Sequence, residues 1–255
     1  MHVVARLTAL LVVASMALLP SLGEGEPTVR DFRLDTSDGF EIVGDLHLGG
    51  GADAPLVVLL HMFRSDRRSW HRLLPELVSS GFNVLAIDQR GHGASKMQNG
   101  EKVKAKLLPR SQNAAWIRRG AGDVVAAVEQ LRAEEGLRPA CVALVGASYG
   151  GTIALLGAAR LNAVCGIVLL SPGIDYFGVD VTDAVGSYPA RARIFVSAGD
   201  RGSVGSARKI KEMLGKRALL TIYEDGGHGT KLLETHPDAV GSIVDFLESA
   251  SRSVE

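Results

Sequence analysis

The segment Val142-Ala143-Leu144-Val145-Gly146-Ala147-Ser148-Tyr149-Gly150-Gly151 decides the fold, because an apolar strand runs into Gly-x-Ser-x-Gly and then into a helical pattern. A serine on such a turn must leave the sheet sharply, and small residues two positions before and after it relieve the crowding. The following helix would direct its N-terminal amides and the positive end of its dipole toward charge forming near Ser148. The segment therefore predicts a nucleophilic serine, with an ordinary glycine turn as the alternative in a chain of 30 glycines.

Apolar runs and helical patterns alternate along the rest of the chain. Two runs with period-two alternation, 29–35 and 40–48, flank Asp38-Gly39 and predict an antiparallel hairpin. Six short apolar strands follow at 56–60, 84–87, 142–145, 167–170, 194–196 and 218–223, with helical patterns at 69–80, 114–135, 149–160, 204–214 and 236–250. The alternation predicts an α/β fold, with a mostly parallel sheet of about eight strands covered by helices on both faces. The connection 171–193 has room for one small helix or an irregular loop, but not for a cap domain.

The N-terminus has the pattern of a secretory signal peptide. Residues 1–6 carry positive charge, residues 7–19 are apolar, and the small residues Ser21 and Gly23 follow. We expect residues 1–23 to be removed and residues 24–255 to form a single domain that is exported to the periplasm or secreted. A permanent membrane anchor is the alternative, although the apolar run is shorter than the roughly 20 residues that a span needs.

Composition narrows the partners and cofactors. The 28 basic and 28 acidic residues give no electrostatic argument for nucleic acid, an anionic membrane or a strongly charged substrate, so neutral or weakly polar substrates fit better. Cys141 and Cys165 fall near the starts of neighbouring strands, where bridge geometry is hard to reach, and we expect free core cysteines although export would permit a disulfide. Two cysteines without nearby histidines also argue against zinc, and no cofactor is expected.

Two further residues complete a candidate catalytic set. A serine hydroxyl needs a base within hydrogen-bond reach, usually a histidine held by a carboxylate. Asp200 and His228 each stand just past the end of a predicted strand, so parallel strands would bring both to the edge of the sheet that carries Ser148. The chain order Ser, Asp, His is one known order for such a triad. Asp175, which follows the preceding strand, is the alternative acid.

Acyl transfer also needs hydrogen-bond donors directed at the developing oxyanion. The amide of Tyr149 would be one, and Met62 or Phe63, in the loop after strand 56–60, would supply the second while lining an apolar acyl pocket. His61 is expected to brace this loop. The segment 88–95 contains a histidine and a serine, but its glycines predict a tight structural loop rather than a second catalytic centre.

Taken together, five segments of the chain resemble the α/β-hydrolase superfamily over about residues 29–250. They are Leu59-Leu60-His61, Asp88-Gln89-Arg90-Gly91-His92-Gly93-Ala94-Ser95, Gly146-Ala147-Ser148-Tyr149-Gly150-Gly151, Gly199-Asp200 and Gly227-His228-Gly229. The lack of room for a cap suggests the compact members, similar to dienelactone hydrolases and small serine esterases. The resemblance implies an eight-stranded sheet, with Ser148 as nucleophile, Asp200 as acid, His228 as base, and oxyanion amides at Tyr149 and at Met62 or Phe63.

The chain departs from this pattern at two positions. Met62 stands where many relatives have glycine, which changes the shape of the oxyanion loop. Dienelactone hydrolases use a cysteine nucleophile where this chain has Ser148, so dienelactone chemistry is not implied.

These features predict a serine hydrolase that cleaves a small-molecule carboxylic ester through an acyl-enzyme. Because little of the chain is left to cover the site, small or extended substrates are favoured over long buried acyl chains. Peptide or amide cleavage, and acyl transfer to acceptors such as peroxide, use the same triad and stay open. A non-catalytic binding module on the same fold is the alternative from another class, and three reactive residues at strand ends argue against it.

Overall fold

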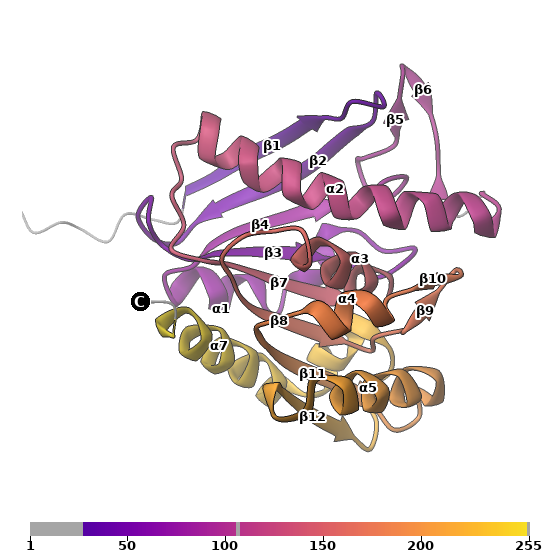
Figure 1. Cartoon of the computed structure of the whole chain (residues 1–255). Helices are drawn as coiled ribbons and strands as arrows, with labels where there is room; N and C mark the ends of the chain where they lie inside the picture. The colour runs from indigo at the N-terminus through magenta and orange to yellow at the C-terminus, as the bar shows by residue number, and fades with distance from the viewer. Residues whose placement is uncertain (1–27, 106–107, 254–255) are drawn as a thin grey trace, which may run out of the picture.

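An eight-stranded sheet runs through the computed structural model, which describes residues 28–105 and 108–253 (Figure 1). The strand order is β1-β2-β4-β3-β7-β8-β11-β12. These strands are β1 (Thr28–Asp35), β2 (Glu41–Leu48), β3 (Leu56–Leu60), β4 (Asn83–Asp88), β7 (Val142–Ala147), β8 (Val164–Leu170), β11 (Arg191–Ser197) and β12 (Ala218–Tyr223). Strand β2 pairs antiparallel with β1 and β4, and the other pairs are parallel. The predicted sheet and hairpin are confirmed, whereas the predicted signal peptide, 1–23, lies outside the described residues.

Helices cover both faces of this sheet (Figure 1). One face carries α2 (Arg110–Glu134), α3 (Tyr149–Ala158), α4 (Thr182–Ser187) and α5 (Arg201–Leu214), and the other carries α1 (Leu74–Ser79), α6 (Leu232–Thr235) and α7 (Pro237–Arg252). A hydrophobic core lies on each face of the sheet, and the side chains of β3 alternate between the two cores. Leu56, Val58 and Leu60 point into the core beneath α2 and α3, whereas Val57 and Leu59 point into the core beneath α1 and α7. All five are fully buried, as expected of a central strand.

Proline residues account for two differences from the predicted helices. The pattern at 69–80 is divided into a short 3-10 helix, η1 (Arg67–Trp70), and α1, because Pro75 lacks the N–H that a continuous helix would need and lies in the first turn of α1. Helix α2 begins four residues earlier than predicted, at Arg110, directly after the extended Pro109. Short 3-10 turns, η3 (Gly215–Arg217) and η4 (Gly229–Lys231), flank β12.

The connection 171–193 contains more structure than the sequence indicated. It forms a small hairpin of β9 (Asp175–Tyr176) and β10 (Val179–Asp180), followed by one short helix, α4, which is the first of the two predicted alternatives. A second small hairpin, β5 (Met97–Gln98) and β6 (Glu101–Lys102), lies in the segment after β4. Both hairpins follow the C-terminal end of a parallel strand, where ligand sites form in such sheets.

The expectation of two free cysteines is wrong. Cys141 and Cys165 form a disulfide, with their Cα atoms 5.7 Å apart. The pairing of β7 with β8 shifts at this point, because Val142 pairs with Val164 whereas Ala143 pairs with Gly166. Cys165 is therefore the extra residue of a bulge, and a bulge re-aims its side chain relative to the regular ladder. This irregularity lets neighbouring parallel strands carry a disulfide.

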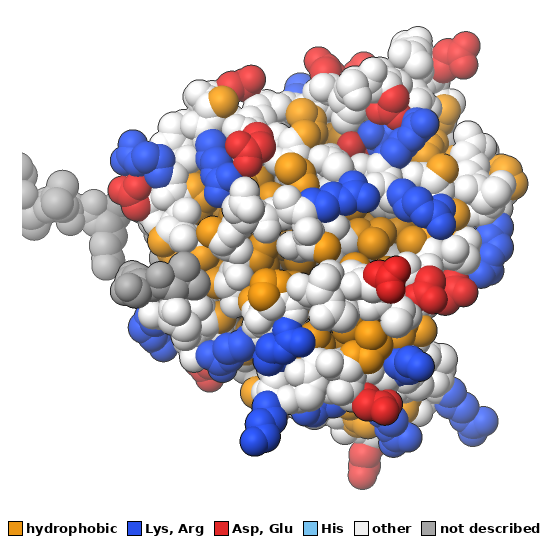
Figure 2. Space-filling model, in the orientation of Figure 1, with side chains coloured by type: hydrophobic (Ala, Val, Ile, Leu, Met, Phe, Trp, Pro, Cys, Tyr) orange, Lys and Arg blue, Asp and Glu red, His pale blue; other side chains and the backbone are white. Residues whose placement is uncertain are grey.

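Charges of both signs are spread over the surface. On the face seen in Figure 2, Lys and Arg side chains alternate with Asp and Glu, and apolar side chains are exposed between them. Within residues 28–105 and 108–253, no helix is both long and apolar enough to cross a membrane.

Helix α3 begins in direct backbone contact with the end of β3. A Cβ atom built on Gly150 would lie 2.0 Å from the carbonyl oxygen of Leu60, and one built on Gly146 would lie 2.5 Å from the carbonyl oxygen of Gly150. No side chain fits at such distances, so both positions require glycine. The contact fixes the start of α3 against the loop that follows β3.

We expect Gly150→Ala to lower the free energy of unfolding by more than about 2 kcal/mol, because the new methyl group has only backbone to displace. Gly151→Ala is the matched control, since its Cβ would be 3.5 Å from the nearest atom and alanine favours a helix. Urea denaturation of both variants measures the difference. Equal stability of the two would contradict the close contact.

Candidate active site

Ser148 occupies the sharp turn between β7 and α3. Its backbone has φ 50° and ψ −113°, a conformation that costs a non-glycine residue about 1–3 kcal/mol. The turn is held from the adjacent strand, since the amide of Ser148 donates a 2.8 Å hydrogen bond to the carbonyl oxygen of Leu170. The side chain makes no capping hydrogen bond to α3, so its hydroxyl remains available for other contacts.

That hydroxyl contacts a residue that the sequence analysis missed. Ser148 Oγ donates to the phenol oxygen of Tyr176 at 3.0 Å, and Ser148 is only 1% exposed. Among the described side chains, no hydrogen bond joins Ser148 to His228. The signal for Tyr176 was an aromatic pair, Tyr176-Phe177, in the loop just past strand 167–170. Contact with the substrate therefore requires Tyr176 to move aside or to share the hydroxyl.

Asp200 and His228 lie side by side, as predicted. Asp200 follows β11, His228 follows β12, and His228 Nδ1 lies 2.6 Å from Asp200 Oδ2. The His228 side chain is 41% exposed, so substrate and water can reach the ring. Asp175 lies elsewhere, in β9, where its carboxylate accepts from the amide of Gly178 at 2.8 Å and is 4.0 Å from Arg110. The structure therefore brings Asp200, and not Asp175, beside the histidine.

The carboxylate of Asp200 is held in its charged form. Burial raises its pKa, but hydrogen bonding to His228, and then to Ser203 and Ser171, outweighs burial and leaves the pKa below its ordinary value. An ionised Asp200 accepts a hydrogen bond from the Nδ1–H of His228, which leaves the lone pair on Nε2. Ser171 also accepts a 3.0 Å hydrogen bond from the amide of Gly229, which ties down the histidine loop. Sequence reasoning missed Ser171, which directly follows β8.

Met62 and Phe63 lie in the loop after β3, beside the histidine loop. A Cβ atom on Gly229 would be 2.7 Å from Met62 Sδ, so Met62 packs directly against the residue that follows His228. Within the described chain, the backbone N–H groups of Tyr149, Met62 and Phe63 donate to no other group. All three amides, which the sequence predicted as oxyanion donors, are thus without a protein partner among the described residues.

His61 braces this loop, as expected. Its Nδ1 donates to the carbonyl oxygen of Met62 at 2.8 Å, and its Nε2 accepts from the amide of Gln89 at 3.0 Å. Burial lowers the pKa of His61, and the neighbouring His92 lowers it further. The ring is therefore a neutral strut that joins the loops after β3 and β4.

Aromatic rings form a wall beside Ser148. The ring of Phe63 lies 5.3 Å from that of His92, 5.6 Å from that of Tyr149 and 5.1 Å from that of Phe177. Tyr176 joins the cluster through Phe177, at 5.3 Å. The β9–β10 hairpin thus packs on the loop after β3 and covers the serine with a phenol.

The segment 88–95 is a structural loop, as its glycines predicted. Ser95 Oγ accepts a hydrogen bond from the amide of Val43 in β2 at 2.8 Å. The guanidinium of Arg90 is buried between Asp123 of α2, at 2.6 Å, and Asp38 of the first hairpin, at 2.7 Å. Ser95 is therefore occupied in holding the loop. Of the described residues, no three His, Cys, Asp or Glu side chains gather as a metal site would require.

Comparisons with known proteins agree with this geometry. Residues 57–204, more than half of the chain, match the model of a family described as the alpha/beta hydrolase family. Epoxide hydrolase B of Mycobacterium tuberculosis is 34% identical over 129 residues, which are 49% of this chain and 32% of that protein. The chain thus matches only about a third of the length of this curated relative.

Solved structures share the fold over most of the chain. An esterase from Pyrococcus furiosus has a TM-score of 0.70 at 20% identity, covering 88% of this chain and 93% of the other. A dienelactone hydrolase from Anabaena variabilis has a TM-score of 0.65 at 20% identity, covering 89% and 96%. These likenesses show the shared fold, and the match to the family model identifies the chain as a member of the alpha/beta hydrolase family.

Proposed function

We propose that this protein is a serine hydrolase that cleaves carboxylic esters through an acyl-enzyme. The observation that carries the proposal is the 2.6 Å contact between His228 Nδ1 and Asp200, at the strand ends next to the turn of Ser148. A carboxylate on Nδ1 selects the tautomer in which Nε2 can accept a proton from a serine.

The proposed reaction begins when Ser148 Oγ turns from Tyr176 toward the histidine. His228 Nε2 takes the serine proton as Oγ attacks the ester carbon, and the amides of Tyr149 and of Met62 or Phe63 stabilise the oxyanion. His228 then gives the proton to the departing alcohol, which leaves the acyl group on Ser148. A water molecule, deprotonated by His228, releases the acid and restores the serine.

Epoxide opening is the second candidate, since epoxide hydrolases are among the relatives. Attack of a serine oxygen on an epoxide carbon would form an ether, which has no electrophilic carbonyl for water to attack. An ester instead gives an acyl-enzyme that the same histidine can help to hydrolyse. The serine at position 148 therefore favours the ester.

The Ser148, Asp200 and His228 set would also serve reactions other than ester hydrolysis. Amide cleavage and acyl transfer use the same residues as ester hydrolysis. Activity on a panel of short and long acyl esters, a lactone, an aryl ester and aminoacyl amides distinguishes these reactions.

We also propose that the protein is exported. The Cys141–Cys165 disulfide supports export, because stable disulfides are rare in the cytosol.

A fluorophosphonate probe tests the nucleophile. We expect it to label the wild-type protein and not Ser148→Ala, whose ester turnover should fall by about 10³-fold or more because no hydroxyl remains to attack. Ser95→Ala is the control, since this buried serine holds a structural loop and should not affect labelling. Absent labelling, or labelling that survives Ser148→Ala, would refute the serine-hydrolase proposal.

The acid is tested by a pair of isosteric variants. Asp200→Asn should lower kcat for p-nitrophenyl acetate by about 10²–10⁴-fold, because an amide no longer selects the reactive tautomer of His228. Asp175→Asn should stay within about twofold of wild type, since it lies away from the histidine. The reverse pattern would make Asp175 the acid.

Tyr176→Phe tests the phenol above Ser148. We expect kcat to fall about tenfold with little change in KM, because the phenol lies where it could donate to the reacting ester oxygens. Phe177→Leu is the control for altered packing, and steady-state kinetics on one short ester compares the variants. Activity of Tyr176→Phe equal to or above wild type would mean that Tyr176 only covers the serine.

A further inference from the structure

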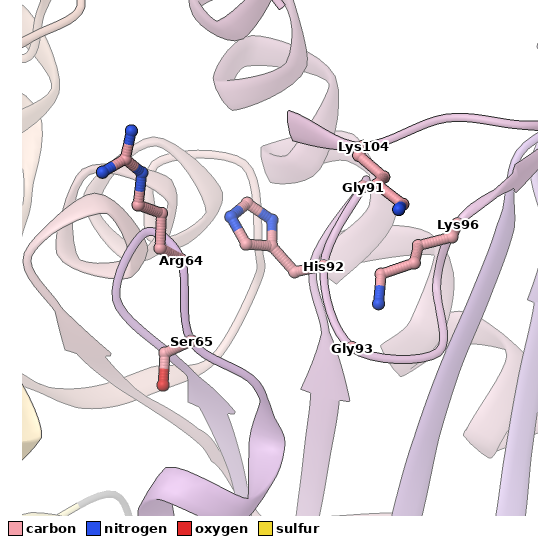
Figure 3. Close-up of a pocket in the computed structure, with 7 residues that line it drawn as sticks. All are labelled: Arg64, Ser65, Gly91, His92, Gly93, Lys96 and Lys104. Atoms are coloured by element: carbon pink, nitrogen blue, oxygen red, sulfur yellow. The ribbon is translucent and has the colours of Figure 1, made fainter. Parts of the chain in front are cut away.

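A pocket of about 610 Å³ lies next to the candidate active site, between the loop after β3 and the segment after β4 (Figure 3). This volume is typical of small-molecule sites. Its polar lining consists of Arg64, Ser65, His92, Lys96 and Lys104, and two glycines complete it. Three of the lining residues are cationic and none is acidic. The composition favours a ligand that carries negative charge.

The three cations lack acidic partners. Within residues 28–105 and 108–253, no ion pair joins Arg64, Lys96 or Lys104 to a carboxylate. Two arginines in the same loops do have acidic partners: Arg67 and Arg90 each form ion pairs with two aspartates. Like charges around one space repel each other, so an anion placed there would be attracted by all three.

His92 adds a buried nitrogen without a partner. The residue is 5% exposed, its Nδ1 donates to the carbonyl oxygen of Arg90 at 2.9 Å, and its Nε2 has no hydrogen bond within the described chain. Figure 3 shows the imidazole between Arg64 and the two lysines. Burial lowers the pKa of His92, which keeps the ring neutral with a lone pair on Nε2. The His92 ring therefore forms a neutral part of the pocket wall, because Nε2 is itself buried away from the open space.

The pocket shares a wall with the serine. The ring of His92 lies 5.6 Å from the ring of Tyr149, the residue after Ser148. Arg64 follows Phe63, whose ring also lies 5.6 Å from that of Tyr149. These ring contacts join the pocket lining to the residue that follows Ser148, so the pocket and the candidate active site are neighbours.

We propose that the pocket formed by Arg64, His92, Lys96 and Lys104 binds the carboxylate or phosphate of an acidic ester while the ester carbon meets Ser148. This substrate class rests on the proposed function. The oxyanion lies among the three cations.

Matched pairs of esters test the proposal. p-Nitrophenyl butyrate and mono-p-nitrophenyl succinate differ by a carboxylate on the acyl side, and methyl 4-acetoxybenzoate and 4-acetoxybenzoate differ by one on the leaving group. We expect kcat/KM to favour the acidic member of one pair by about tenfold, and 0.5 M salt to reduce this ratio. The Lys96→Gln/Lys104→Gln variant should lower the ratio about tenfold. Lys102→Gln, in the same segment but outside the pocket lining, should leave it unchanged.

A binding measurement separates this inference from the proposed function. In the Ser148→Ala protein, methyl hydrogen succinate or methyl phosphate should raise the melting temperature, whereas dimethyl succinate should not, and the larger shift identifies the preferred oxyanion. When Lys96→Gln and Lys104→Gln are combined with Ser148→Ala, the anions should no longer raise the melting temperature.

The outcomes are distinct. The anion pocket would be refuted if the protein hydrolyses neutral esters as well as acidic ones and neither anion raises the melting temperature. The esterase proposal would then still stand. No turnover of any ester, together with a shift that depends on the lysines, would overturn the esterase proposal and keep the pocket.

Discussion

The backbone contact between Gly150 of α3 and the end of β3 is the constraint on which the site depends. The carbonyl oxygen of Leu60 fills the space that any side chain at position 150 would need. The contact holds the start of α3, where Tyr149 follows Ser148, against the loop that carries Met62 and Phe63. Two segments far apart in the sequence are thereby packed together beside the serine turn, and the amides of Tyr149, Met62 and Phe63 donate to no other group of the described chain.

The rest of the site is assembled from the ends of parallel strands. Strands β7, β8, β11 and β12 are neighbours in the sheet, so Ser148, Ser171, Asp200 and His228 emerge along one edge. Local contacts then set their geometry. Ser171 holds the amide of Gly229, and Met62 packs against the same glycine. The histidine loop is fixed from two sides, which suits a residue that must present its ring at a defined angle.

The sequence predicted the sheet and three residues of the candidate site, because their signals are local. Strand periodicity locates strand ends, and parallel pairing brings these ends to the same edge of the sheet. The disulfide and Tyr176 gave no comparable signal. Cys165 reaches Cys141 through a one-residue register shift, which no periodicity reveals. Tyr176 reaches Ser148 only because the β9–β10 hairpin folds back onto Phe63, through packing between distant segments.

The sequence by itself determined the hydrolase fold, the serine turn with its two glycines, and the strand-end positions of Asp200 and His228, because steric limits and hydrophobic periodicity act over a few residues. Only the tertiary structure decided that Asp200 contacts His228 and that Tyr176 covers Ser148. It also decided that three cationic side chains line one pocket. Basic and acidic residues are equal in number, yet Arg64, Lys96 and Lys104 line one pocket without a carboxylate. A sum of charges discards position, whereas electrostatic attraction depends on the distance between charges in the folded chain.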